Sequence, residues 1–256
     1  MDRLSKKVIA VTGATKGIGY GIAKALAREG ANVVIGGRSQ QAGEMLVNHI
    51  ASVYEKESLF VQGDVRDETY CKRLIDQAVQ RFGHLDGLVN NAGIFPQVSF
   101  FDSTAELFDQ VYEVNIRGAF LCSKYAVQRM IDSGGSIVHI GSTHAFGACA
   151  HYAAYGTSKG ALYSLHQYLS ENYAKNQIRS NWITVGWVAT EGEKKRIEEE
   201  GHGLQWLNQT AREMCPLGGL QTEEDIAMGT IYLLSDESRM VTGTDLRITG
   251  GFKPDH

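Results

Sequence analysis

A glycine-rich turn between the first apolar segment and the first helical segment restricts the fold more than any other feature. Residues 8–12 form a short, mostly apolar segment that is rich in β-branched side chains. Gly13, Gly17 and Gly19 follow it. The helical stripe that comes next consists of Ile18, Ile22, Ala25 and Leu26. Glycines let a backbone approach a pyrophosphate at the positive end of a helix, so this strand, turn and helix predict a dinucleotide site. The spacing departs from the commoner Gly-x-Gly-x-x-Gly pattern, and packing is the competing explanation for such a turn.

Short apolar segments alternate with amphipathic helical segments along the rest of the chain. The expected strands lie at residues 8–12, 31–35, 59–62, 87–90, 135–140, 178–184 and 245–249. The expected helices lie after the glycine turn and at residues 40–53, 68–82, 104–130, 152–174 and 223–234. This alternation predicts an α/β fold built on a doubly wound parallel sheet of about seven strands.

No linker, repeat or change of composition divides the chain. A length of 256 residues allows one domain or two, and we expect a single dinucleotide-binding domain over residues 1–256. Residues 187–216, called the insertion below, interrupt the alternation with a charged stretch and a helical piece near Trp206. We expect the insertion to cover the carboxyl edge of the sheet, either as a substrate lid or as a solvated, charged helix.

The end of the second expected strand bears on the choice between NAD and NADP. NAD-selective sites usually carry an acidic residue there, which holds the ribose 2′-hydroxyl. Residues 36–39 read Gly-Gly-Arg-Ser and contain no acid, whereas Arg38 and Lys16 supply two cations for a 2′-phosphate. We therefore expect NADP(H) ahead of NAD(H), against the alternative that both cations are ordinary surface residues.

Tyr155 and Lys159 are four residues apart on the predicted helix at 152–174 and share one of its faces. An ammonium beside a phenol favours the phenolate, so we expect Lys159 to lower the tyrosine pKa from about 10. That shift would allow proton transfer near neutral pH. This pair occurs on many helices by chance, but Ser142 follows the strand at 135–140, at the sheet edge where ligands bind.

These motifs, in this order, resemble the short-chain dehydrogenase/reductase family from about Lys6 to Gly251. The matching pieces are residues 12–19, Asp64-Val65, Asn90-Asn91-Ala92-Gly93, Asn115, Ser142, Tyr155 with Lys159, Thr242-Gly243 and Gly250-Gly251. Each piece is weak alone, but their order and separations together are specific to the family. The resemblance implies a Rossmann fold and an NAD(P)(H)-dependent oxidoreductase. Such an enzyme interconverts a secondary alcohol and a ketone or aldehyde by hydride transfer.

The resemblance also implies roles for individual residues. Tyr155 would exchange a proton with the substrate oxygen and Ser142 would hold that oxygen. Lys159 would bind the nicotinamide ribose, while Asn115, through a helix kink and a water, would link Lys159 to solvent. The implied cofactor-binding residues are Gly13, Thr15, Lys16, Gly17, Ile18, Gly19, Arg38, Ser39, Asp64, Val65, Asn91, Ala92, Gly93, Tyr155, Lys159, Gly186, Val188 and Thr190.

Within that set, Asp64 would bond the adenine amino group, Asn91 would frame the cofactor cleft, and Thr190 would touch the nicotinamide carboxamide. One position departs from the family pattern. Val185 stands before Gly186 where the family commonly has a proline. The change affects the shape of the loop but deletes no reacting group, so we expect activity to survive.

The substrate is the least determined part of the prediction. Phe95, His144, His151 and Trp187 are expected to face the cleft, although each histidine has a structural hydrogen-bonding role as its alternative. Aromatic walls with polar groups suit a small polar hydroxy compound such as a sugar or polyol. The alternative enzyme is a 3-oxoacyl-thioester reductase, for which the acidic chain offers no evident basic surface. The alternative of another class is a catalytically silent nucleotide-binding sensor or scaffold.

Composition and charge restrict the partners. A net charge of -4 gives no basic footprint, so we expect no nucleic-acid partner. The cysteines at 71, 122, 149 and 215 are widely spaced, which indicates reduced thiols, no metal site and a cytoplasmic protein. No apolar run reaches about 20 residues, so we expect no membrane span. By the family resemblance we expect a homotetramer, or failing that a dimer, assembled through the helices at 104–130 and 152–174.

Overall fold

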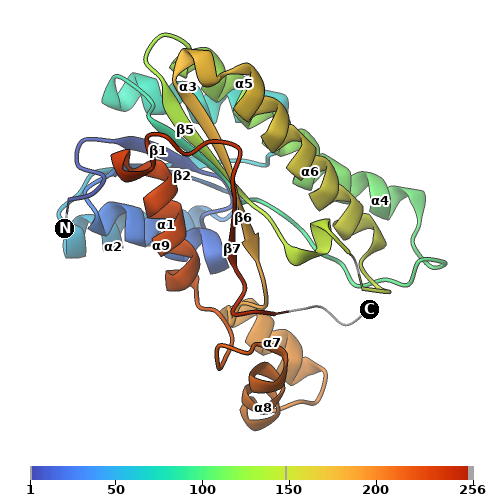
Figure 1. Cartoon of the computed structure of the whole chain (residues 1–256). Coiled ribbons are helices and arrows are strands. Elements are labelled where there is room, and N and C mark those ends of the chain that lie inside the picture. The colour runs from blue at the N-terminus through green and yellow to red at the C-terminus, as the bar shows by residue number, and fades with distance from the viewer. Residues whose placement is uncertain (1, 148, 253–256) are drawn as a thin grey trace.

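A seven-stranded parallel sheet forms the centre of the computed structural model, which describes residues 2–147 and 149–252 (Figure 1). Its strands are β1 Val8–Val11, β2 Asn32–Gly37, β3 Ser58–Gln62, β4 Gly87–Asn90, β5 Gly135–Ile140, β6 Ile178–Val185 and β7 Asp245–Ile248. Their order is β3-β2-β1-β4-β5-β6-β7. The predicted doubly wound sheet is confirmed. The direction of winding reverses between β1 and β4, which is where such sheets bind ligands.

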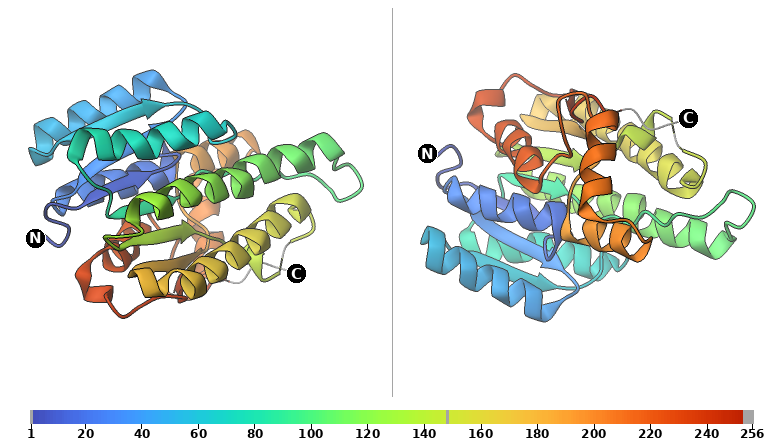
Figure 2. Two further views of the ribbon diagram at one scale, coloured as in Figure 1. Left: turned by 90° about the horizontal axis from the view of Figure 1, so that it is seen from above. Right: turned by 90° about the horizontal axis from the view of Figure 1, so that it is seen from below.

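Helices cover both faces of the sheet (Figure 2). They are α1 Gly17–Arg28, α2 Gln40–Tyr54, α3 Glu68–Phe82, α4 Ala105–Tyr112, α5 Gly118–Met130, α6 Ala153–Asn172, α7 Glu191–Glu199, α8 Leu204–Met214 and α9 Glu223–Leu234. The short helical turns are Glu113–Arg117, Thr143–Ala145, Ala174–Asn176 and Asp236–Ser238. Helices α1, α2 and α9 pack on one face, and α3, α5 and α6 pack on the other. Because both faces are covered, a central strand such as β1 is buried at every position.

Two segments differ from their expected form. The helix expected at 104–130 is interrupted by a π-helical turn at Glu113–Arg117, which separates α4 from α5. The insertion contains two helices, α7 and α8, which project together from the rest of the molecule in Figure 1. The charged stretch forms α7, and Ile197 is its buried residue. Ion pairs between residues three or four apart support this polar helix.

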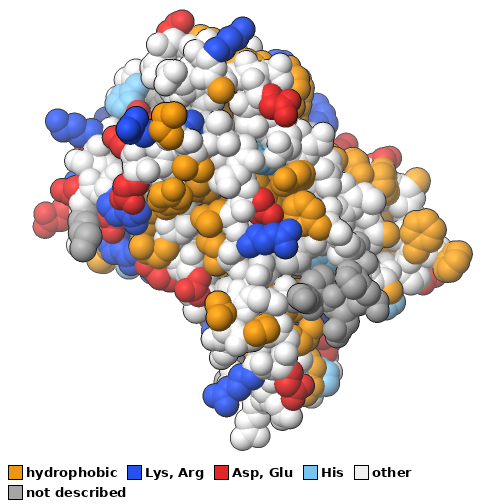
Figure 3. Space-filling model, viewed as in Figure 1, with side chains coloured by type: hydrophobic (Ala, Val, Ile, Leu, Met, Phe, Trp, Pro, Cys, Tyr) orange, Lys and Arg blue, Asp and Glu red, His pale blue; other side chains and the backbone are white. Residues whose placement is uncertain are grey.

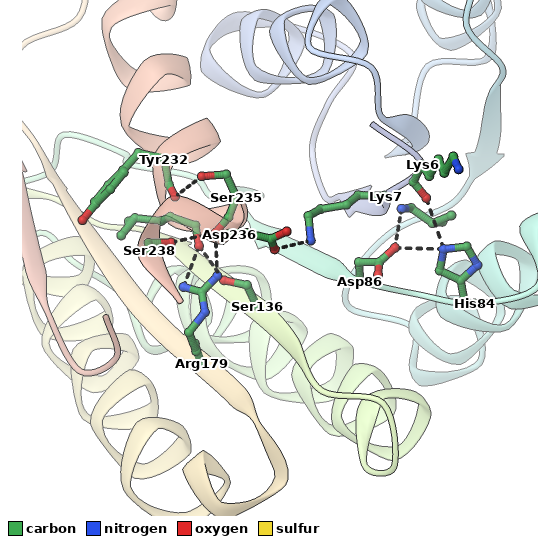
Figure 4. A network of polar contacts seen from close by, with 12 residues as sticks. Lys6, Lys7, His84, Asp86, Ser136, Arg179, Tyr232, Ser235, Asp236 and Ser238 are labelled. Atoms are coloured by element: carbon green, nitrogen blue, oxygen red, sulfur yellow. Dashed lines mark hydrogen bonds and ion pairs between the residues drawn. The ribbon is translucent and has the colours of Figure 1, made fainter. Parts of the chain in front are cut away.

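Polar contacts organise the edge of the sheet where the strands begin (Figure 4). The guanidinium of Arg179 donates to the carbonyl oxygens of Leu233 at 2.8 Å and Ser235 at 3.3 Å, at the end of α9. A cation there satisfies helix carbonyls that have no partner within the helix. Lys7 and Asp236 form an ion pair at 2.8 Å beside it. This edge lies opposite the edge that carries the candidate catalytic residues.

Within residues 2–147 and 149–252, we find no helix with the length and apolar character needed to cross a lipid bilayer.

Candidate active site

The glycine turn leaves the beginning of α1 open to a ligand. Gly13 and Gly17 have φ angles of 64° and 54°, which favour glycine. A Cβ atom at Gly19 would lie 2.3 Å from Nδ2 of Asn91, so the turn has no room for a larger residue. Lys16 precedes the helix and makes no side-chain cap, so the first amide groups of α1 remain available. This arrangement fits the pyrophosphate of a dinucleotide.

Asn91 ties the glycine turn to the end of β4. Its Nδ2 donates to the carbonyl oxygens of Thr12 at 2.9 Å and Gly13 at 3.1 Å. The backbone amides of Asn91 and Ala92 both donate to Oγ1 of Thr12, each at 3.0 Å. The side chain of Asn91 is therefore engaged with the turn itself, which it holds in a fixed position.

Polar residues gather beyond β2 and β3. Arg38 is exposed, and Ser39 caps α2 by accepting a hydrogen bond from the amide of Ala42. Partial burial acts to raise the pKa of Asp64, but hydrogen bonds from Arg66 and the charge of Arg38 outweigh it and keep the pKa low. The Asp64–Arg66 ion pair, at 2.9 Å, was not foreseen. The available signal in the sequence was that the two opposite charges are only two positions apart.

The structure brings the three candidate catalytic side chains together. Ser142 is buried after β5, and its hydroxyl hydrogen-bonds with Tyr155. Lys159 directs its Nζ to the carbonyl oxygen of Ile140 at 2.8 Å, and this nitrogen is 5.8 Å from the centre of the Tyr155 ring. A Cβ atom at Gly93 would lie 3.8 Å from the same nitrogen. The end of β4 thus approaches the same site.

The expected lowering of the Tyr155 pKa is wrong for this structure. Burial raises the pKa of Tyr155 to about 12, although the hydrogen bond from Ser142 acts in the opposite direction. Burial also lowers the pKa of Lys159 to about 8. The burial that disfavours the phenolate thus also disfavours the ammonium beside it. Desolvation therefore outweighs the attraction that the helical spacing suggested.

Asn115 lies within the π-helical turn and is completely buried. Its Oδ1 accepts from the amide of Ile94 at 2.8 Å, and its Nδ2 donates to the carbonyl of Ile94 at 2.9 Å. The same Nδ2 donates to Oγ of Ser158 at 3.0 Å. The π-helical turn thus coincides with a side chain that holds the segment after β4 against α6. The kink expected at Asn115 takes this form.

Aromatic rings pack around the ring of Tyr155. The rings of Phe95 and His144 lie 6.0 Å and 5.7 Å from its ring, measured between centroids. Tyr152 was not among the predicted site residues. The centroid of its ring lies 4.7 Å from that of His144, and its hydroxyl accepts a hydrogen bond from Gln97. Its position three residues before Tyr155, on the same helical face, was the available signal.

The other two expected substrate residues are placed differently. Trp187 donates its indole N–H to Oε1 of Glu193 in α7 at 2.7 Å, so it anchors the insertion. The side chain of His151 is exposed, and no ring contact joins it to Tyr155 in the part of the chain that the structure describes. Of the four expected substrate residues, Phe95 and His144 are the two that pack against Tyr155.

Gln221 supports the loop that follows β6. Its backbone carbonyl accepts from the amide of Ala189 at 2.8 Å, and its amide donates to the carbonyl of Trp187 at 3.1 Å. A Cβ atom at Gly186 would lie 2.7 Å from Oε1 of Gln221. These contacts fix the loop where the family commonly relies on proline. Thr190 follows, and its Cγ2 would lie 3.6 Å from a Cβ atom at Gly17.

The chain is similar along almost its whole length to known oxidoreductases. A family model described as enoyl-(acyl carrier protein) reductase matches residues 13–253. The NADP-dependent (R)-specific alcohol dehydrogenase of Lentilactobacillus kefiri is 33% identical over 255 residues, which are 98% of this chain and 98% of that protein. The chain belongs to the short-chain dehydrogenase/reductase family.

Two further members of the family are named for sugars. The L-rhamnose 1-dehydrogenase (NAD(P)(+)) of a Sphingomonas species is 32% identical and covers 98% of each chain. The structure of L-sorbose reductase from Gluconobacter frateurii, complexed with NADPH and L-sorbose, has a TM-score of 0.94 at 26% identity and covers 98% of each chain. Family membership makes this protein an oxidoreductase that uses NAD(P) and acts on alcohols or carbonyl compounds.

Proposed function

We propose that this protein is an NADP(H)-favouring dehydrogenase/reductase that interconverts a secondary hydroxyl and a carbonyl group on a small sugar or polyol. The observation that carries the proposal is the cluster of Ser142, Tyr155 and Lys159 beside the glycine turn. A silent sensor or scaffold has no need of this cluster. The proposal includes one domain over residues 1–256.

In this proposal the bound nicotinamide accepts a hydride from the substrate carbon or returns one to it. During carbonyl reduction the phenol of Tyr155 gives its proton to the substrate oxygen and becomes a phenolate, and during alcohol oxidation that phenolate takes the hydroxyl proton back. The hydroxyl of Ser142 donates a hydrogen bond to the substrate oxygen as negative charge develops there. Lys159 orients the ribose, and Asn115 connects this region to solvent through a water.

The preference for NADP(H) rests on the charges around the adenosine end. Lys16 and Arg38 are exposed beyond β1 and β2, and no acidic residue ends β2. A 2′-phosphate placed there meets two cations, whereas a 2′-hydroxyl finds no carboxylate at the end of β2. Asp64 would then bond the adenine amino group, and the ion pair with Arg66 would hold its carboxylate in place.

The choice of a neutral, polar substrate rests on the insertion, which we propose to be the lid. Arg196 in α7 pairs with Glu193 and Glu200, so its charge is compensated. The indole N–H of Trp187 donates to Glu193 at 2.7 Å, so α7 is tied to the loop that follows β6. A 3-oxoacyl thioester is the second candidate, and compensated cations favour it less. The sugar-named relatives support the first candidate.

We also propose that the protein is a cytoplasmic homotetramer. Apolar side chains are exposed on the segment that carries α4 (Figure 3), and Phe108 there is 42% exposed. Phe120 on α5 and Tyr168 on α6 are 51% and 54% exposed. These helices are the ones expected to form the subunit contacts. Buried, reduced thiols such as Cys71 and Cys122 suit the cytoplasm.

A two-part experiment tests the proposal. Fluorescence titration with NADPH and NADH measures cofactor preference, and nicotinamide absorbance measures turnover on sugars, polyols, simple alcohols and keto compounds. We expect tighter NADPH binding, reversed by Arg38→Asp, and turnover that Tyr155→Phe abolishes without loss of cofactor binding. The matched control is Arg81→Asp, which makes the same change of charge at an exposed arginine in the last turn of α3. Activity that persists in Tyr155→Phe would refute the tyrosine assignment, and tight binding without any turnover would favour the sensor.

A further inference from the structure

The carboxylate of Asp64 receives three hydrogen bonds from a single residue, Arg66. The backbone amide of Arg66 donates to Oδ1 at 3.0 Å. Its Nε and Nη2 both donate to Oδ2, at 3.1 Å and 2.9 Å. An ionised carboxylate offers about four acceptor positions, two on each oxygen. Both positions on Oδ2 are therefore occupied, and one position on Oδ1 remains open.

The open acceptor belongs to a turn at the ligand-binding edge of the sheet. The amide of Gly63 donates to the carbonyl oxygen of Gly37 at 2.9 Å, so the turn after β3 lies directly beside the end of β2. The side chain of Asp64 is 27% exposed, which leaves part of it accessible to a ligand. The next backbone amide, that of Val65, donates no hydrogen bond to any residue in 2–147 or 149–252. An acceptor and a donor thus stand on consecutive residues.

A second arginine holds the backbone of the first. Nη1 of Arg117, in the π-helical turn, donates to the carbonyl oxygen of Arg66. A Cβ atom at Gly118 would lie 2.8 Å from Cβ of Val65, so the turn after β3 is also packed closely against the beginning of α5. The turn that carries Asp64 therefore has a fixed support on the side of α5.

We propose that Arg66 is a positioning residue for the purine of the cofactor. It holds Asp64 so that the open position on Oδ1 accepts a hydrogen bond from the 6-amino group of adenine, and Arg117 holds Arg66 in place. Both arginines act through Asp64 and do not touch the base. This inference rests on the adenine-binding role of Asp64 in the proposed function and names the residues that orient it.

The arrangement predicts selection between two purines. The edge of adenine presents an amino donor beside the N1 acceptor, which complements the acceptor of Asp64 and the amide donor of Val65. Hypoxanthine presents an oxo acceptor beside an N1–H donor, which is the reverse pattern. A correctly held Asp64 should therefore favour adenine, whereas a carboxylate free to rotate should distinguish the two bases less.

Fluorescence titration measures this selection without turnover. We compare the Kd of NADPH with that of its analogue in which hypoxanthine replaces adenine, and use the ratio of the two values. The charge of Arg66 attracts the phosphates of both nucleotides alike, so its attraction cancels in the ratio. We expect a ratio of about tenfold or more in the wild type. Arg66→Gln should lower the ratio by about threefold or more, and Arg117→Met should lower it as well.

Two comparisons separate positioning from a general effect on structure. Arg81→Gln makes the same change at another exposed arginine, which pairs with Glu57 at 2.9 Å, and should keep the wild-type ratio. In an Asp64→Ala background, adding Arg66→Gln should leave the ratio unchanged, because the carboxylate that Arg66 holds is gone. The Tm of Arg66→Gln should stay close to that of the wild type, since an exposed ion pair contributes little to stability.

The outcomes distinguish this inference from the function on which it depends. Equal wild-type affinities for the two nucleotides, a full ratio in Arg66→Gln, or an equal effect of Arg66→Gln with and without Asp64 would overturn the inference and leave the dehydrogenase intact. Selection of adenine that depends on Arg66, with no turnover on any alcohol or carbonyl compound, would support the inference and overturn the proposed function. Absence of dinucleotide binding would overturn both.

Discussion

Gly141, which directly precedes Ser142, should tolerate no side chain. A Cβ atom there would lie 2.0 Å from Cε2 and Cζ2 of Trp182. This indole is fully buried, and its N–H donates to Oγ1 of Thr184 at 2.8 Å, so it has little freedom to move. Gly141 does not have a positive φ, so an alanine would be opposed by packing and not by backbone strain.

The size of the effect follows from that distance. Ordinary contact begins at 3.4 Å, so the backbone at 141 and the indole must separate by about 1.4 Å. Overpacking of this kind costs about 1–3 kcal/mol of stability. A reacting group displaced by 1 Å can lose about 100-fold in rate. We therefore expect Gly141→Ala to lower both the Tm and kcat, while NADPH binding at the glycine turn changes little.

The assay compares kcat, Tm and NADPH affinity in matched variants. Gly160→Ala is the control, because a Cβ atom there would lie 3.7 Å from its nearest neighbour, the carbonyl oxygen of Ala145. Replacing Trp182 with leucine in the Gly141→Ala background should restore part of kcat by removing the obstructing ring. Wild-type kcat and Tm in Gly141→Ala would refute the packing argument.

Two further predictions concern stability. Arg179→Met should lower stability by about 1–3 kcal/mol, measured by urea unfolding, because it removes the charged donor that bonds the carbonyls of Leu233 and Ser235 at the end of α9. The exposed Arg239→Met is the control, and equal losses in both variants would contradict the role of Arg179. Lys159 has its folded pKa lowered to about 8, so between about pH 8 and its ordinary value of 10.5 the unfolded chain binds more protons and stability rises with pH. The Tm advantage of Lys159→Met over the wild type should therefore shrink from pH 7 to pH 10, and an advantage that does not change would exclude the burial cost of Lys159.

Several element boundaries were predictable because local signals and tertiary structure agree. Helix α3 spans Glu68–Phe82 as expected, and its ends are marked in the sequence. Asp67 caps the beginning by accepting from the amide of Thr69, and Gly83 ends the helix with a φ of 88°. Strand β4 likewise spans Gly87–Asn90, where an apolar run enters a fully buried sheet.

Features that depend on distant partners were not predictable in the same way. The π-helical turn contains Asn115, whose side chain bonds the backbone of Ile94, 21 residues earlier in the chain. The direction of the Tyr155 pKa shift depends on burial, which the spacing of two residues does not report. Gln221 supports the loop after β6 through contacts with residues more than 30 positions away. The spacing of a motif identifies such a residue only when its position already belongs to the known pattern of the family.

The contrast between the two edges of the sheet explains where these unpredictable features gather. At the edge in Figure 4, the charged groups of Arg179 and Lys7 have protein partners, and the resulting contacts serve stability. At the opposite edge, α1 begins without a side-chain cap and Nε2 of His144 has no partner within the described residues. Polar groups without protein partners beside Tyr155 lower the stability of the free protein. A ligand that forms hydrogen bonds with them stabilises the folded state. NADPH should therefore raise the Tm of the wild type, and it should raise the Tm of Arg38→Asp by less.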